Sequence, residues 1–245
     1  MKKKKRILIL CVIAAVICII TVQGLYTAGI NFAGPLKQLG IQKIKDMYDP
    51  AKRSGEIVFY GASNFTRWKT MEEDIPAYKV QNHGFGGSND QNLIDFAPEL
   101  LYPYKPQIIV FQTGSNDYTA AEGSDSEKIQ FCMERKKKMF ALFHEQLPDA
   151  QMIVLSGLYL PGRSEYYDLT KEINKQLEEL CAESDYLTYV NAEALTYQNG
   201  AFDTGMFVKD GIHLTDEARR IWANTYIIPA IDAVVEQIGA DSLKR

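Results

Sequence analysis

From residue 56 onward, short apolar runs of strand length alternate with stretches in which apolar residues recur at helical spacing. The strand-like runs cover residues 57–60, 78–81, 108–112, 152–156 and 187–190. The helical patterns cover residues 89–101, 126–146, 168–182 and 216–238. Several strand runs are apolar throughout, which is typical of parallel strands buried on both faces. The alternation therefore predicts an α/β fold, with helices on both faces of a parallel sheet of about five strands.

The N-terminus has a different pattern. Residues 2–6 are all basic, and residues 7–22 (ILILCVIAAVICIITV) contain no charged side chain. A segment that is apolar all round is typical of a membrane helix, and residues 23–26 extend it toward the length of about 20 residues that a span needs. Because basic flanks stay in the cytoplasm, we predict a single-pass cell-membrane anchor through residues 7–26 with the rest of the chain outside. The alternatives are a cleaved signal peptide, which leads to secretion, and an ordinary buried helix.

These patterns divide the chain of 245 residues into three parts. Residues 1–26 are the basic flank and the hydrophobic segment. Residues 27–54 are interpreted as a linker and a short amphipathic helix, because glycine and proline precede apolar residues at helical spacing. Residues 55–245 have the length of one domain.

Charge and cysteine usage exclude some classes of partner. The net charge is −4 although residues 2–6 contribute +5, so the remaining chain carries −9. An acidic body binds phosphates poorly, which argues against a nucleic-acid partner, and the basic run 135–138 is interpreted as a solvated helix face. Cys132 and Cys181 lie in helical patterns without metal-ligand spacing. We interpret them as small apolar packing residues, with an extracellular disulfide as the alternative.

Polar residues with catalytic potential follow the predicted strands, where sites form in open parallel sheets. Ser63 follows the first strand in the sequence GASN, and its hydroxyl would lie at a helix start where unpaired N–H groups favour an oxyanion. A serine that only caps the helix is the alternative. The second strand leads into residues 82–88 (NHGFGGS), whose glycines indicate close backbone approach or positive φ, and His83 beside them could line the site. A plain turn is also possible there, whereas no GK[ST] follows to make a phosphate loop.

Two further motifs complete the set. The third strand ends in residues 113–117 (TGSND), in which the Asn116 side-chain amide could donate to an oxyanion, although these residue types also favour Asx turns. Residues 210–213 (DGIH) precede the last helix, and the Asp210 carboxylate can reach back to one ring nitrogen of His213. Together the motifs supply a nucleophile, a base, an orienting acid and oxyanion donors, which acyl transfer requires.

In these four blocks, over about residues 55–238, the chain resembles the SGNH (GDSL-type) hydrolase family. The resemblance implies a flavodoxin-like three-layer α/β/α sandwich, with Ser63 as nucleophile, His213 as general base and acid, and Asp210 as its orienting carboxylate. It also implies an oxyanion hole formed by the backbone N–H groups of Ser63 and Gly87 and the Asn116 amide. If the motif aligns one residue earlier in the glycine cluster, Gly86 takes the place of Gly87 as the oxyanion donor. No metal and no organic cofactor is implied.

One departure from the family is visible. The usual Asp-Ser-Leu is Ala-Ser-Asn here, at residues 62–64. Residues 159–168 (YLPGRSEYYD) are interpreted as a loop over the site. We expect a membrane-anchored serine esterase acting on a small ester, a lipid or an acylated glycan. The alternatives are acyl transfer to, or deacetylation of, cell-envelope glycans, and a non-catalytic surface binding module on the same scaffold.

Overall fold

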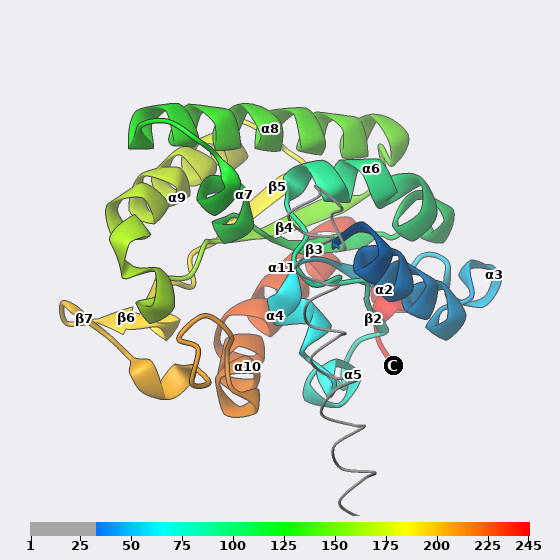
Figure 1. Ribbon diagram of the computed structural model, residues 1–245. Coiled ribbons are helices and arrows are strands. Elements are labelled where there is room, and N and C mark those ends of the chain that lie inside the picture. Colours follow the sequence, from blue (N-terminus) through cyan, green and yellow to red (C-terminus); the bar gives the residue numbers. More distant parts are fainter. Residues whose placement is uncertain (1–32) are drawn as a thin grey trace, which may run out of the picture. The chain divides into compact units, whose positions relative to one another are not determined.

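The structure is a computed structural model that describes residues 33–245 (Figure 1). The chain separates into two compact units, 1–39 and 40–245, and the second contains the sheet. The predicted membrane segment 7–26 lies outside the described residues. Among residues 33–245, no helix combines the length and the apolar character that a membrane span requires.

A parallel sheet of five strands forms the centre of residues 40–245. Its strands are β1 (Ile57–Gly61), β2 (Val80–Asn82), β3 (Ile108–Gln112), β4 (Gln151–Leu155) and β5 (Leu187–Val190). They are arranged in the order β2-β1-β3-β4-β5, and every neighbouring pair is parallel. This is the flavodoxin-like order, so the predicted fold class is confirmed. The second strand starts two residues later than predicted, because Tyr78 instead forms an isolated antiparallel bridge with Lys244.

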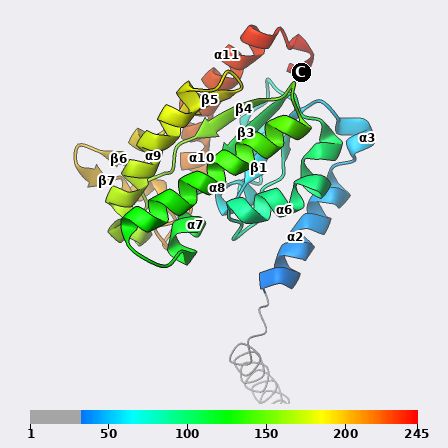
Figure 2. The same ribbon diagram turned by 90° about the horizontal axis from the view of Figure 1, so that it is seen from above.

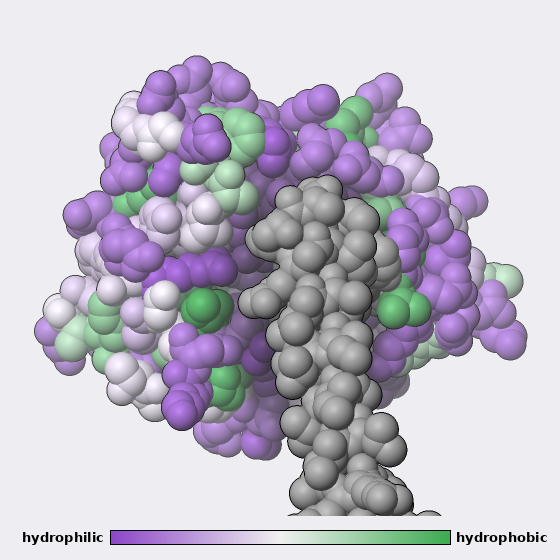
Figure 3. Space-filling model, viewed as in Figure 1, coloured by the Kyte–Doolittle hydropathy of each residue, from purple (hydrophilic) through white to green (hydrophobic). Residues whose placement is uncertain are grey.

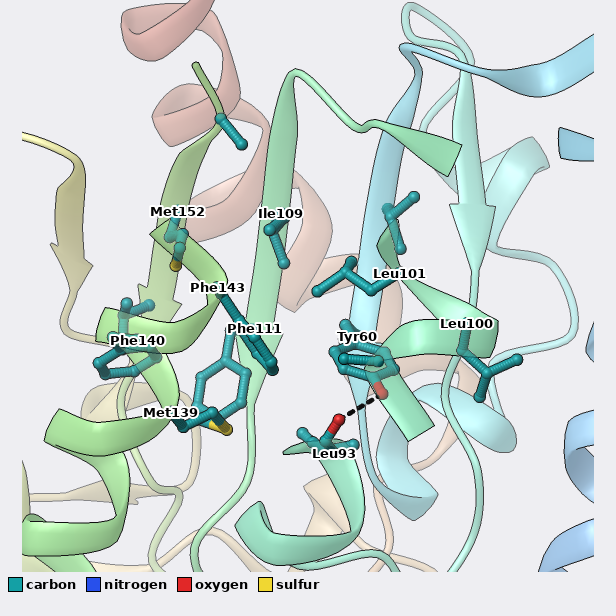
Figure 4. Packing of buried hydrophobic residues seen from close by; sticks show 14 of the residues in the cluster. Tyr60, Leu93, Leu100, Leu101, Ile109, Phe111, Met139, Phe140, Phe143 and Met152 are labelled. Atoms are coloured by element: carbon teal, nitrogen blue, oxygen red, sulfur yellow. Dashed lines mark hydrogen bonds between the residues drawn. The ribbon is translucent and has the colours of Figure 1, made fainter. Parts of the chain in front are cut away.

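Helices cover both faces of this sheet, as Figures 1 and 2 show. Helices α6 (Asp90–Leu100), α8 (Asp125–Gln146) and α9 (Tyr167–Ala182) pack on one face. The other face is covered by α10 (Asp216–Trp222) and α11 (Ile228–Ile238). Successive strand residues point to opposite faces, so Val58 and Tyr60 join the first hydrophobic cluster while Ile57 and Phe59 join the second. Figure 4 shows the first cluster, in which the Tyr60 hydroxyl also donates to the Leu93 carbonyl at 2.7 Å.

The predicted helix over residues 216–238 is interrupted. A π-helical turn, η5 (Ala223–Ile227), separates α10 from α11. Pro229 has no N–H to continue an α-helical ladder and lies in the first turn of α11, which accounts for the break. The predicted cap is present, since the Thr215 hydroxyl accepts from the Ala218 N–H at 3.1 Å.

Short elements connect this framework. The remaining helices are α2 (Ala33–Met47), α3 (Pro50–Arg53), α4 (Ser63–Thr66), α5 (Met71–Asp74) and α7 (Ser115–Ala120). The 3₁₀ turns are η1 (Tyr102–Tyr104), η2 (Pro161–Tyr166), η3 (Glu193–Leu195), η4 (Thr204–Met206) and η6 (Asp241–Leu243). A hairpin of β6 (Tyr197–Gln198) and β7 (Ala201–Phe202) stands apart from the main sheet.

Cys132 on α8 and Cys181 on α9 are both buried, and both are free thiols. The disulfide alternative is therefore wrong, and packing among apolar side chains is their structural role. On the surface, the large hydrophobic side chains of Met47, Phe131 and Val208 are exposed on three different elements or loops. The face of the described residues visible in Figure 3 is mainly hydrophilic, with apolar side chains scattered over it.

Candidate active site

Ser63 is held at the turn between β1 and α4. Gly61 ends the strand, and a Cβ there would lie 2.4 Å from the Gln112 carbonyl oxygen of the adjacent β3. A larger residue would separate the two strands at this point. The Ala62 carbonyl accepts from the Phe65 N–H at 3.2 Å and from the Thr66 N–H at 3.1 Å, which closes the first helical turn. This turn places Ser63 at the carboxyl end of the sheet.

His213 and Asp210 lie in a compact turn before α10. The Val208 N–H donates to the His213 carbonyl at 2.9 Å, and Gly211 adopts a φ of +65°, a conformation that favours glycine. The Asp210 Oδ1 accepts the backbone N–H groups of Ile212 and His213, both at 2.9 Å. Its Oδ2 accepts from the His213 Nδ1 at 2.7 Å. Because Nδ1 carries this proton, Nε2 is free to accept another.

Packing brings the two turns together. The His213 Nε2 lies 2.9 Å from the Ser63 Oγ, although the residues are 150 positions apart. Phe65 of α4 stacks on Trp222 of α10 with ring centroids 5.8 Å apart, which joins the helices that follow the two turns. The Asn64 side chain accepts from the Leu214 N–H at 3.3 Å. The unusual Asn in the nucleophile motif therefore ties that motif to the histidine turn.

The carboxylate of Asp210 stays ionised. Desolvation raises its pKa, but the hydrogen bonds from the His213 backbone and ring and from the Ile212 N–H outweigh this and hold the pKa well below its usual range. The Arg67 guanidinium lies 3.7 Å from the same carboxylate. A charged carboxylate in this position can stabilise an imidazolium at His213.

The glycine cluster makes a tight turn opposite Ser63. The Ser88 N–H donates to the Phe85 carbonyl at 3.3 Å, and Gly87, at the third position of the turn, has a φ of +72°. A positive φ at that position is a feature of type II turns and requires glycine or asparagine. Gly86 and Gly87 line the same cavity as Ser63.

Asn116 follows β3 on the first turn of α7, where Gly114 with a φ of +138° starts the helix. Its Nδ2 donates to the Ser88 carbonyl at 2.9 Å. Both terminal nitrogens of Arg163 donate to its Oδ1 at 3.4 Å. The amide has two N–H groups, so one is used by Ser88 and the second is left for a ligand.

These groups line one cavity of about 380 Å³. Its polar wall includes Ser63, Asn116 and His213, and its apolar wall comes from Leu158, Leu160, Tyr118, Ile173 and Leu177. The cavity lies at the carboxyl ends of β1 and β3, where the strand order reverses and ligands bind in open α/β sheets. Within residues 33–245, no cluster of three or more His, Cys, Asp or Glu side chains is arranged to hold a metal ion.

The sequence profile of the GDSL-like Lipase/Acylhydrolase family matches residues 55–221. The match covers more than half of the chain. This chain belongs to that family. The resemblance found in the motifs is thereby confirmed, and the protein is an acylhydrolase of the GDSL-like type.

Solved structures show the same fold as this GDSL-like acylhydrolase. A protein from Streptococcus pneumoniae, named as a proposed platelet activating factor, has a TM-score of 0.68 and 18% identity over 84% of this chain and 96% of its own. A GDSL-like lipase from Bacteroides thetaiotaomicron has a TM-score of 0.61 and 20% identity over 81% and 98%. An acetyl-xylooligosaccharide esterase from Geobacillus has a TM-score of 0.56 and 14% identity over 76% and 95%. No curated protein matches the chain in sequence.

Sequence reasoning misjudged one basic residue of the acylhydrolase. Residues 135–138 were expected on a solvated helix face, but the Lys136 side chain is only 1% exposed. Its Nζ lies 3.0 Å from the Asp90 Oδ2 and 3.2 Å from the Thr113 Oγ1. On α8, Lys136 shares the face of Cys132, Met133 and Phe140, so helical periodicity was the signal that could have placed it inside.

This buried lysine links the loop that follows β2, which carries Gly87, to the loop that follows β3, which carries Asn116. Asp90 follows the glycine turn and accepts from the Thr113 hydroxyl, which precedes Asn116. The Asp90 N–H donates to both carboxylate oxygens of Asp117, at 3.1 and 3.2 Å. Burial and the Asp90 charge raise the pKa of Asp117 to about 7. Asp117 therefore orients the backbone at Asp90 within a charged network that the sequence did not reveal.

His83 lies away from the cavity. It is fully buried, and its Nδ1 contacts the Leu100 carbonyl at 2.6 Å while its ring packs on Tyr48 and Tyr104. Burial lowers the pKa of His83 to about 4. Its role is structural, and the expectation that it lines the site is wrong.

Proposed function

We propose that this acylhydrolase is a serine esterase in which Ser63 is the nucleophile, His213 the general base and acid, and Asp210 the orienting carboxylate. The observation that carries the proposal is the continuous hydrogen-bonded path from the Ser63 Oγ through the imidazole to Asp210, with links of 2.9 and 2.7 Å. Both links lie within the range required for proton transfer.

In the proposed reaction, the Ser63 Oγ bonds to the ester carbonyl carbon as its proton moves to the His213 Nε2. The carbonyl oxygen becomes an oxyanion, held by the backbone N–H groups of Ser63 and Gly87 and the free N–H of Asn116. Collapse breaks the bond to the alcohol, which leaves with the proton from His213. Water then loses a proton to His213 and attacks the acyl-enzyme, and the acid is released with Ser63 restored.

Ser63→Ala tests the proposal. We expect it to abolish hydrolysis of 4-nitrophenyl acetate, and labelling by a fluorophosphonate, while the circular dichroism spectrum stays that of the wild type. Ser115→Ala is the matched control, because Ser115 lines the same cavity but the His213 ring is hydrogen-bonded to Asp210 and Ser63 instead. Unchanged hydrolysis in Ser63→Ala would reject the assignment. Absence of fluorophosphonate labelling in the wild type would instead favour a non-catalytic binding module.

We further propose that residues 7–26 anchor the enzyme in the cell membrane with residues 55–245 outside the cytoplasm. The support is the basic run 2–6 followed by an uncharged apolar segment. Tagging the C-terminus and treating intact cells with protease tests this, and a tag that is digested only after lysis contradicts it. An external location would give access to envelope glycans. Acetate release measured with and without glycan acceptors then separates hydrolysis from acyl transfer.

A further inference from the structure

The charged side chains that line the active-site cavity are all cationic. They are Arg67, Lys136 and Arg163, and none of the residues lining this cavity is an aspartate or a glutamate. The whole chain has a net charge of −4. A cavity lined by positive charges attracts negatively charged ligands, even in a protein whose net charge is negative. The distribution therefore favours anionic ligands.

The three cations differ in how far they are neutralised. Lys136 is paired with Asp90 at 3.0 Å and is inaccessible. Arg67 lies 3.7 Å from Asp210. Among the described residues, no carboxylate lies within 4.0 Å of Arg163. Arg163 therefore adds an uncompensated positive charge to the cavity.

The backbone holds Arg163 against the catalytic turn. Its neighbour Gly162 donates to the Gly211 carbonyl at 2.9 Å, and a Cβ on Gly162 would lie 2.4 Å from the Asp210 carbonyl oxygen. Turn η2 is thus packed directly on residues 210–212. The Arg163 N–H also donates to the Leu160 carbonyl at 2.9 Å. These contacts hold Arg163 next to the turn that carries Asp210 and His213.

The Arg163 side chain spans the cavity wall to Asn116. Its two terminal nitrogens contact one oxygen, the Asn116 Oδ1, and both distances are a long 3.4 Å. A guanidinium has five N–H donors in a planar fork that matches the two oxygens of a carboxylate or phosphate. Asn116 accepts from only two of these N–H donors, so the others are available to a ligand beside the Asn116 amide.

We propose that Arg163 binds an acidic group, a carboxylate or a phosphate, on the substrate of this esterase. The inference rests on the proposed function and adds the substrate class, esters that carry a negative charge near the scissile bond. The acidic group would pair with the guanidinium fork while the ester carbonyl lies between Ser63 and Asn116. Charge-assisted pairing of this kind selects an anionic ester over a neutral ester of the same shape.

A pair of matched esters tests the proposal. 3-Acetoxybenzoate and 3-acetoxybenzamide have nearly the same shape and differ in one negative charge. We expect the wild type to have the higher kcat/KM for the benzoate. Arg163→Gln should lower the ratio of the two kcat/KM values by about 10- to 100-fold, mainly through KM of the benzoate. Lys171→Gln is the control, because it removes the same charge from an exposed residue of α9 that does not line the cavity.

The ratio of kcat/KM for the benzoate to that for the benzamide shows whether Arg163 contacts the substrate or only supports the structure. If Arg163 acts only by holding Asn116, Arg163→Gln lowers kcat/KM for both esters equally, and the proposal is overturned. It is also overturned if the wild type hydrolyses both esters equally well. If the wild type hydrolyses neither these esters nor 4-nitrophenyl acetate, the proposed esterase function itself fails.

Two further substrate pairs identify the source of the acidic group. A short-chain anionic phospholipid is compared with a neutral diacylglycerol, and an O-acetylated uronic acid with an O-acetylated neutral hexose. Once the benzoate pair has given the expected result, a preference that depends on Arg163 in either of these pairs assigns the acid to a lipid phosphate or a sugar carboxylate. If Arg163→Gln changes the substrate preference in none of the three pairs, the proposal is refuted.

Discussion

Lys136→Met removes the cation that braces the two candidate oxyanion loops. Methionine has nearly the length and helix propensity of lysine, so α8 should persist. The substitution leaves the Asp90 carboxylate buried with only the Thr113 hydroxyl as a side-chain donor. Asp117 remains beside it, with Arg135 at 3.5 Å as its nearest cation.

The size of the effect follows from burial. The side chains of Lys136 and Asp90 are 1% and 0% exposed, so solvent cannot replace the lost partner. Removing one member of a buried ion pair costs about 3–5 kcal/mol of unfolding free energy. The loss should grow with pH, because Lys136 lowers the pKa of Asp117, so its removal raises that pKa further above the unfolded value. The acyl-transfer rate should fall as well, since the loops around Gly87 and Asn116 lose their common support.

Urea unfolding followed by circular dichroism, at mildly acidic and mildly alkaline pH, measures this loss. Lys137→Met is the matched control, because Lys137 is exposed on the same helix and should change stability by less than about 0.5 kcal/mol. In Lys136→Met/Asp90→Asn the buried negative charge is also removed, and part of the stability should return. A loss below about 1 kcal/mol at alkaline pH, or a double variant no more stable than the single one, would refute the reasoning.

Three further predictions follow from the same structure. Asn116→Ala should lower kcat for 4-nitrophenyl acetate by about 10²–10³ with little change in KM, and a fall of less than about fivefold would show that the amide is not an oxyanion donor. Burial lowers the pKa of His83 from about 6.5 in the unfolded chain to about 4, so the unfolded state binds more protons between these pH values. The contribution of neutral His83 to the unfolding free energy is therefore full above about pH 6.5, and up to about 3 kcal/mol of it is lost as the pH falls to about 4. In urea titrations at both pH values, His83→Gln should lose less stability on acidification than the wild type, and an equal loss would contradict this origin. Burial raises the pKa of Cys132 and of Cys181 to about 12, so iodoacetamide at neutral pH should modify neither thiol in the native protein and both after unfolding. Peptide mass mapping measures this, and modification of either thiol in the native protein would contradict their burial.

The fold was accessible from the sequence because its signals are local. Strands buried on both faces are apolar throughout, and helices covering them show one apolar stripe, so neighbouring residues alone indicate the element type. The break at residues 223–227 was missed even though Pro229 marks it, because the apolar periodicity continues across it. The start of β2 was misplaced because Tyr78 is apolar but pairs with the C-terminal segment.

The motifs of the candidate site were also visible in the sequence, since a serine, a glycine cluster and an asparagine each follow a predicted strand and an Asp-x-x-His precedes the last predicted helix. Only the tertiary structure decided that Ser63 and His213 meet, because their contact depends on strand order and on the stacking of Phe65 on Trp222. It also decided which carboxylate pairs with Lys136 and that Arg163 faces the cavity without a carboxylate partner. Charged side chains carry no local signal of their partners, whose positions are set by packing between segments far apart in the chain.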